Sequence, residues 1–303
     1  MNTEHNSVNT CLGTGGDEMY NYSYNCSDDG YYTDMAIERR RADLTKNGIE
    51  YTKELCPAGY WERINVKSES GAESIGRPCG RYDTLTTKRL DTLDEDALYD
   101  AQEEVAKTLC KICDDIAVMP ARILIIGLGN EYVTADSIGV KCAAKVKPTM
   151  HIRCYDEEFF DELECSEIAV LCPGVSAKTG MDSTETAKAI CSAISPDIVI
   201  AIDSLSTRSR KRLGTTLQIS DTGIFPGGVG NLKSPLTRPE LGVPVIGIGV
   251  PTVMDTRLFI NKNTFSEFDF EPLFVSPREI DEITDAAATV IAGAINQAFG
   301  LSY

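Results

Sequence analysis

The chain has 303 residues, a hydrophobic content of 42% and a formal net charge of −17. This length and apolar content are enough to bury a core without disulfides or metals. The acidity argues against direct binding to nucleic acid, which needs clustered Lys and Arg. No apolar run approaches the roughly 18 residues of a membrane-spanning helix, and the polar N-terminus lacks a signal-peptide pattern. We expect a cytoplasmic protein with neither nucleic acid nor membrane as a direct partner.

Cysteine and histidine patterns do not predict a metal or redox centre. The eleven cysteines lack the even, regular spacing of a disulfide framework. Cys110 and Cys113 form one C-x-x-C in a predicted helix, and no second pair follows at zinc-site spacing. A nucleophile or metal site based on histidine would have to use His151, because His5 lies in a polar tail. We therefore expect packed thiols, no cofactor and no metal.

The N-terminal third of the chain divides into three stretches. Residues 1 to about 30 have the polar composition of a disordered arm, so we assign 1–34 to a flexible N-terminal arm and 35–303 to one α/β domain. Between about 47 and 90, apolar patches alternate with Gly and Pro, which predicts edge strands and turns. Apolar residues then recur at helical spacing from Leu98 to Ile116, which predicts a helix packed on a sheet.

Short apolar runs at 123–126, 168–171, 198–202 and 243–250 alternate with segments long enough for helices. This pattern predicts a single domain with a twisted, mainly parallel sheet flanked by helices. Near the C-terminus, Ser276-Pro-Arg-Glu279 has the pattern of a capping box and precedes an amphipathic helix.

Two of the predicted strands lead to an aspartate. Asp136 follows the turn at 127–130, and Asp203 follows directly after 198–202. Ligands and catalytic groups gather at the carboxyl ends of parallel strands, so the pair indicates paired-carboxylate chemistry. Two structural alternatives are that Asp136 caps the next helix and that Asp203 pairs with a nearby Arg or Lys. A dinucleotide site is disfavoured because Tyr132 stands where the third glycine would fall.

Glycine-rich turns and polar residues next to these strands predict the walls of a substrate cleft. Asp182 belongs to this region as a loop or helix-start residue, and the polar run 215–221 is expected to line the approach. The candidate cleft residues are Gly129, Asn130, Gly174, Thr179, Ser220 and Asp221.

Several elements in chain order resemble the germination (spore) protease family. They are Gly127-Leu-Gly-Asn with Thr134-Ala-Asp136, and the segments 173–181, 201–205, 218–223, 228–231, 247–253, 275–279 and 290–294. The resemblance implies an aspartic endopeptidase that initiates degradation of small acid-soluble spore proteins during germination, with Asp136 and Asp203 as catalytic residues. It also implies the spore core of an endospore-forming bacterium as location, a homotetramer, and a fold similar to hydrogenase-maturation proteases.

The resemblance further implies an inactive precursor that shortens itself near its N-terminus. Tyr32-Thr-Asp-Met-Ala-Ile-Glu38 resembles the family's processing segment, so we expect a cut at or beside Asp34–Met35 in an exposed, flexible junction. Two features depart from the family: residues 1–30 match no element of it, and the stretch between Asp255 and Leu273 is shorter than usual. Rival interpretations are a hydrogenase-maturation-like metallopeptidase and a binding module without catalytic activity. The sequence does not assign the role of each aspartate.

Overall fold

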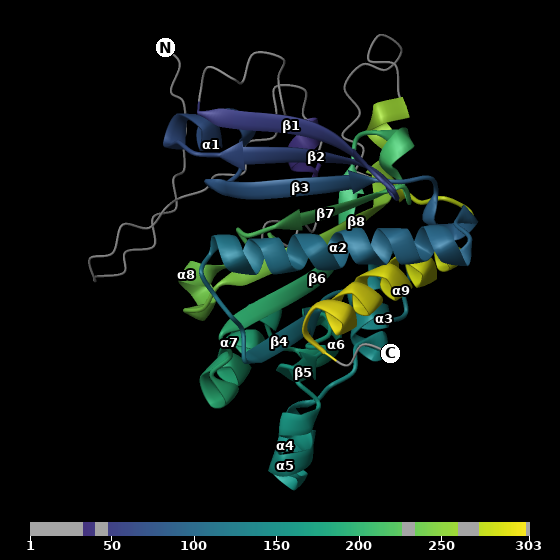
Figure 1. The fold of residues 1–303 in the computed structure, drawn as a ribbon. Coiled ribbons are helices and arrows are strands. Elements are labelled where there is room, and N and C mark those ends of the chain that lie inside the picture. Colours follow the sequence, from purple (N-terminus) through teal and green to yellow (C-terminus); the bar gives the residue numbers. More distant parts are fainter. Residues whose placement is uncertain (1–32, 40–47, 226–233, 260–272, 301–303) are drawn as a thin grey trace.

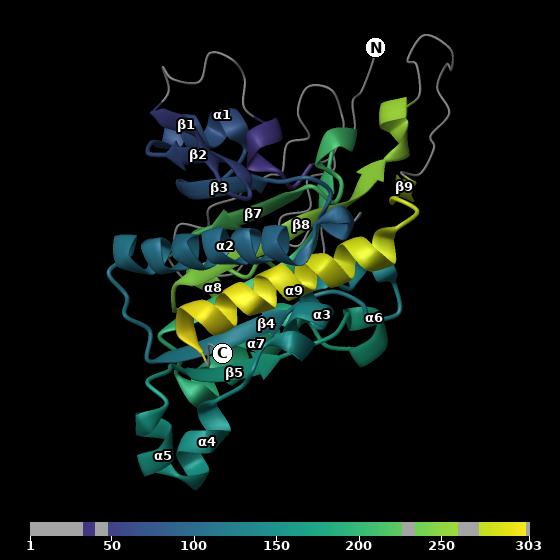
Figure 2. The same ribbon diagram turned by 45° about the vertical axis from the view of Figure 1, so that its right-hand side comes forward.

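The computed structural model describes residues 33–39, 48–225, 234–259 and 273–300. Within these ranges, nine strands form one sheet with helices on both faces (Figures 1 and 2). The strand order is β1-β2-β3-β7-β8-β6-β4-β5, and β9 pairs with β8. Most of the predicted arm, residues 1–32, lies outside the described residues, as do the family-like segment 228–231 and most of the shortened stretch before Leu273.

The sheet is mixed, with a parallel half and an antiparallel half. The strands are β1 (Ile49–Cys56), β2 (Gly59–Val66), β3 (Gly80–Thr86), β4 (Arg122–Gly127), β5 (Glu167–Leu171), β6 (Ile198–Thr207), β7 (Thr216–Ser220), β8 (Val245–Asp255) and β9 (Phe274–Val275). Strands β5, β4, β6 and β8 run parallel to their neighbours in that group, whereas β1, β2, β3, β7 and β9 pair antiparallel. The predicted α/β class is confirmed, and the sheet carries more antiparallel strands than the prediction of a mainly parallel sheet implied.

The two longest helices, with a shorter one beside them, cover one face of the sheet, and other helices cover the opposite face. The longer helices are α2 (Glu95–Asp115), α3 (Ile138–Lys145), α7 (Ser183–Ile194) and α9 (Ile280–Phe299). The shorter ones are α1 (Glu69–Ile75), α4 (Met150–Tyr155), α5 (Glu157–Glu162), α6 (Ser176–Thr179) and α8 (Arg238–Leu241). Short 3₁₀ helices are η1 (Ala36–Glu38), η3 (Leu90–Thr92), η4 (Thr134–Asp136), η5 (Arg210–Arg212) and η6 (Thr256–Phe259). Helices α2 and α9 lie side by side across the sheet, while α4 and α5 project beyond β5 (Figures 1 and 2).

The core forms two apolar layers, one on each face of the central strands. Ile200 and Ile202 pack in the layer of α2 and α9, whereas Val199 and Ala201 pack in the layer of α7 and α8. Strands buried on both faces have continuous apolar sequences, which is why these strands could be predicted. Because side chains alternate along a strand, Asp203 faces the same side as Ala201, away from α2 and α9. In the described part of the chain, no helix is both long and apolar enough to cross a membrane.

The last helix begins without the predicted capping box. Helix α9 starts at Ile280, and Glu279 occupies its N-cap position without a side-chain capping hydrogen bond. Instead, Glu279 Oε2 lies 3.3 Å from Arg89 Nη2 in an ion pair. A contact with a distant segment has therefore replaced the local cap.

Truncating a side chain in the buried layer between the sheet and helices α2 and α9 should destabilise the protein strongly. Ile200 is fully buried, whereas Leu55, in β1, is 89% exposed. Because Ile200→Ala leaves a cavity, we expect it to lower the free energy of unfolding by about 2–5 kcal/mol. Leu55→Ala is the control and should change that energy by less than about 0.5 kcal/mol. Urea unfolding followed by circular dichroism measures both, and equal losses would contradict the packing described.

Candidate active site

The carboxyl ends of β4 and β6 lie side by side at one edge of the sheet. Their parallel pairing ends with Gly127 opposite Ile202, and Leu128 N donates one further hydrogen bond to Ile202 O at 2.9 Å. Strand β6 continues past this point, because β8 pairs with it as far as Thr207 opposite Met254. The prediction that the strand ends before Asp203 is therefore wrong. Asp203 is the first β6 residue beyond the last β4 pair.

Asp203 lines a small cavity at this edge. The residue is 9% exposed, and its Oδ1 accepts a hydrogen bond from Ser204 N at 2.8 Å. The cavity has a volume of about 20 Å³ and is also lined by Gly129, Gly174 and Asp182. A site holds a water when about 10–15 Å³ is free and polar partners surround it. The cavity therefore has room for one water beside the Asp203 carboxyl.

Asp136 reaches the same edge through the turn after β4. It is the last residue of η4, and Ser137 occupies the N-cap position of α3, so Asp136 is not the helix cap of the structural alternative. Asn130 N donates to Asp136 O at 2.9 Å, which draws the turn back on itself. A Cβ at Gly129 would lie 1.9 Å from Asp136 O and 3.3 Å from its Oδ1. Gly129 thus touches Asp136 on one side and the Asp203 cavity on the other.

Two further predicted residues, Gly174 and Asp182, line this cavity, and Thr179 does not. Gly174 lines it, and a Cβ at Gly174 would lie 3.1 Å from Thr179 Cγ2. Thr179 itself is exposed in α6. Asp182 is the N-cap of α7, where its Oδ1 accepts hydrogen bonds from the backbone N–H groups of the next helical turn. The predicted double role of Asp182, at the helix start and at the site, agrees with this position.

Ser220 and Asp221 occupy a neighbouring region over β7. Ser220 lines a second cavity of about 30 Å³, together with Asp34, Arg77 and Gln218. Asp221 is not among the residues that line it; its Oδ1 accepts from Arg81 N at 2.8 Å, and burial raises the pKa of its carboxyl.

Pairing across the sheet brings this second region close to Asp203. Gln218 stands opposite Gly249 on β8, and Gly249 stands opposite Asp203 on β6. Gln218 and Asp203 therefore lie in one row, two strands apart. Of the polar run 215–221 predicted to line the approach, Gln218 and Ser220 line the second cavity, whereas Thr216 is 1% exposed opposite Thr86 on β3 and lines neither cavity. Arg77 carries no local signal that could have identified it.

The predicted processing segment is buried, so the expectation of an exposed junction is wrong. Asp34 is 6% exposed and Met35 is 0% exposed. Asp34 N donates to Ser206 O at 3.0 Å, and Asp34 Oδ2 accepts from Ser206 N at 2.8 Å. Arg77 Nη2 lies 3.7 Å from Asp34 Oδ1. The segment therefore docks on β6, three positions beyond Asp203 in sequence.

Cys110, Cys113 and His151 lie on helices α2 and α4, which do not line this cavity. Cys110 and Cys113 lie on α2, where burial raises the pKa of the Cys110 thiol and raises that of Cys113 to about 12. Thiols with raised pKa stay protonated and unreactive at neutral pH. His151 is exposed on α4 and contacts Tyr155 edge to face. Among the described residues, no three His, Cys, Asp or Glu side chains cluster as a metal site requires.

The close contact between Gly129 and Asp136 can be tested by adding one methyl group. Gly129 has φ +105° and Gly180 has φ +73°, but only Gly129 has an atom within 4 Å of a new Cβ. Both Gly→Ala changes introduce backbone strain of about 1–2 kcal/mol, and Gly129→Ala adds a clash of about 1–3 kcal/mol. We expect a larger loss of unfolding free energy for Gly129→Ala in chemical denaturation. Equal losses would show that the turn does not press on Asp136.

Comparison with known proteins gives the family. Residues 33–270 match the family model of the germination proteases. A germination protease of Caldanaerobacter subterraneus subsp. tengcongensis is 33% identical over 310 residues, covering 89% of this chain and 94% of that protein. The germination protease of Bacillus subtilis is 35% identical over 235 residues, covering 74% of this chain and 63% of that protein.

Among solved structures, a NiFe hydrogenase maturation protease HycI from Thermococcus kodakarensis has a TM-score of 0.35 and 21% identity, covering 61% of this chain and 99% of that one. The family match extends over most of the chain, and the two germination proteases are similar to it over most of its length. The chain therefore belongs to the germination protease family, and it is a protease of spore germination.

Proposed function

We propose that this protein is an aspartic endopeptidase that initiates degradation of small acid-soluble spore proteins, with Asp136 and Asp203 activating water. The observation that carries the proposal is that Asp203 lines a water-sized cavity and that Asp136 contacts a glycine of the same lining. Gly129 links them, because it touches Asp136 and lines the cavity with Asp203. Family membership supports the peptidase activity and its place in germination.

Peptide hydrolysis by a carboxyl pair requires one carboxyl to be ionised while the other is protonated. The ionised carboxylate accepts a proton from water, and the water oxygen adds to the peptide carbonyl carbon. The protonated partner donates to the leaving nitrogen, the C–N bond breaks, and a carboxyl and an amine are produced. Two carboxyls in one dry site keep one proton between them, because both cannot ionise at close range. Low exposure of Asp203 suits this arrangement, since a drier site strengthens each electrostatic interaction.

The proposal includes three properties implied by the family resemblance. The protein is made as a precursor that cuts itself at Asp34–Met35, which removes the N-terminal arm. It assembles as a homotetramer, and it acts in the cytoplasm of the spore core. The hydrogen bonds between Asp34 and Ser206 support the first property, because they hold the bond to be cut on β6, the strand that carries Asp203.

Neutralising either aspartate should abolish proteolysis without unfolding the protein. Asn replaces Asp with little change in volume, so Asp136→Asn and Asp203→Asn should each lower turnover of a small acid-soluble spore protein by about 10²–10⁴-fold. Asp161→Asn, at an exposed residue of α5, is the matched control and should retain parental activity. Cut bonds are identified by mass spectrometry, and circular dichroism verifies folding.

The same assay separates the competing functions. Near-parental turnover by a folded Asp136→Asn or Asp203→Asn variant would refute the pair, and loss of activity on chelation would favour a metallopeptidase. A parental protein that cuts nothing would favour the binding module.

Self-processing predicts a defined new N-terminus. Incubation of the full-length protein should yield a chain that begins at Met35, identified by N-terminal sequencing and intact mass. Asp203→Asn should stay full length under the same conditions, because the cut uses the same carboxyl pair. A fully active protein that still begins at Met1 would refute the precursor.

A further inference from the structure

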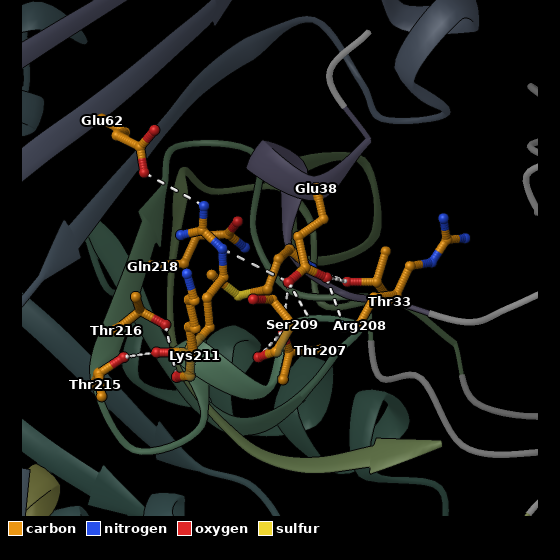
Figure 3. A network of polar contacts seen from close by, with 12 residues as sticks. Thr33, Glu38, Glu62, Thr207, Arg208, Ser209, Lys211, Thr215, Thr216 and Gln218 are labelled. Carbon is orange, nitrogen blue, oxygen red and sulfur yellow. Dashed lines mark hydrogen bonds and ion pairs between the residues drawn. The ribbon is translucent and has the colours of Figure 1, made fainter. Parts of the chain in front are cut away.

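The Glu38 side chain lies in a carboxylate-binding turn formed by the end of β6 and the residues after it, Thr207, Arg208 and Ser209 (Figure 3). Glu38 Oε1 accepts from Ser209 N at 3.1 Å and from the Thr207 hydroxyl. Its Oε2 accepts from Arg208 N at 2.7 Å and from the Thr33 hydroxyl at 2.6 Å. Both carboxylate oxygens are thus held by donors from two distant parts of the chain.

A cation completes this site. Arg212 Nε lies 3.6 Å from Glu38 Oε1, and Arg212 Nη2 lies 3.3 Å from Glu62 Oε2, so the guanidinium bridges the two acids. The Glu38 side chain is only 7% exposed. Charge-assisted hydrogen bonds to a buried carboxylate are the stronger class, and each is worth roughly twice a neutral one. Glu38 is therefore a firm attachment point of its segment.

The side chain of Gln218 makes a second contact, at the bond that we propose is cut. Gln218 Nε2 donates to Asp34 O at 3.3 Å, and Gln218 Oε1 accepts from Ala36 N at 2.8 Å. Asp34 O is the carbonyl oxygen of the Asp34–Met35 bond itself, and Ala36 N belongs to the next peptide group, so the two hydrogen bonds lie on either side of Met35. Gln218 stands in the row that includes Asp203, with Gly249 between them. One side-chain amide therefore fixes the position of this bond relative to the strand that carries Asp203.

We propose that Glu38 is a positioning residue that selects the Asp34–Met35 bond for self-processing. With its carboxylate fixed in the Thr207–Ser209 turn, the short η1 helix determines which residues reach Gln218. The peptide bond beside Gln218 is then the one that follows Asp34, the residue four positions before Glu38. Glu38 contacts no reacting atom, and the inference rests on the proposed self-processing.

Removing the charge of Glu38 tests the anchor. Glu38→Gln keeps the length of the side chain but places an N–H₂ group among the backbone donors of Arg208 and Ser209. We expect the first-order rate of self-processing to fall about tenfold or more, and the new N-termini to become heterogeneous. Glu50→Gln is the control, because Glu50 is exposed and pairs with Lys67 at the surface. It should be cut at one bond at the parental rate.

An insertion tests whether Glu38 sets the register. One alanine inserted between Ala36 and Ile37 leaves the sequence around Asp34–Met35 intact but shifts it by one residue relative to Glu38. If the anchor sets the position, intact mass should show the cut moved to the Met35–Ala36 bond. A cut that stays after Asp34 at the parental rate would overturn the inference. Thermal unfolding verifies each fold, and Glu38→Gln decides the question alone if the insertion variant does not fold.

The outcomes distinguish this inference from the proposal on which it rests. If the parental chain is never cut near Asp34, the proposed self-processing is wrong. If the parental chain is cut there, but Glu38→Gln yields the same single N-terminus at the same rate, only the positioning role of Glu38 is wrong. A merely structural role for Glu38 would lower stability and leave the position of the cut unchanged.

Discussion

The pairing of β6 with β8 beyond the end of β4 is the interaction on which both the site and the docked segment depend. It holds Asp203 in a regular strand where β4 no longer covers it, and it carries β6 on to Ser206 and Thr207. Buried backbone groups need partners, and Asp34 supplies them for Ser206 by bonding both its N–H and its C=O. A single strand extension therefore supplies the Asp203 carboxyl, the docking surface and the turn that holds Glu38.

Close backbone packing places Asp136 beside that extension. A Cβ at Gly139 would lie 2.3 Å from Leu128 O and 2.4 Å from Ile202 O, so α3 can approach the sheet edge this closely only with glycine there. Asp136 lies just before α3, and its position follows from that contact. Thr252 adds a hydrogen bond of 2.7 Å from its hydroxyl to Ala135 O. The position of Asp136 is thus fixed by backbone contacts on either side of it in sequence.

The parallel strands, and the position of Asp203 and of the turn that carries Asp136 at one sheet edge, could be predicted, because doubly buried strands leave continuous apolar runs and parallel strands end at one edge. The length of β6 could not be predicted, because Ser204, Ser206 and Thr207 interrupt the apolar run. These residues belong to the strand only because they pair with β8. The burial of Asp34 and Glu38 could not be predicted from the sequence either. A polar stretch is typical of a flexible arm, and the partners that bury these acids lie about 170 positions away in the sequence.

The docked segment relates the two cavities to each other. Asp203 lines one and Asp34 lines the other. Leu205 is two residues from Asp203 on the same face of β6 and packs with Met35, Ala36 and Ile37. In the proposed function, departure of this segment would uncover Leu205, Gln218 and Ser220 in a strip that leads to the Asp203 row. An extended peptide could lie on such a strip through main-chain hydrogen bonds. The surface that holds the processing segment is then the one that a substrate needs, so the same contacts that fix the position of the bond also keep the site covered.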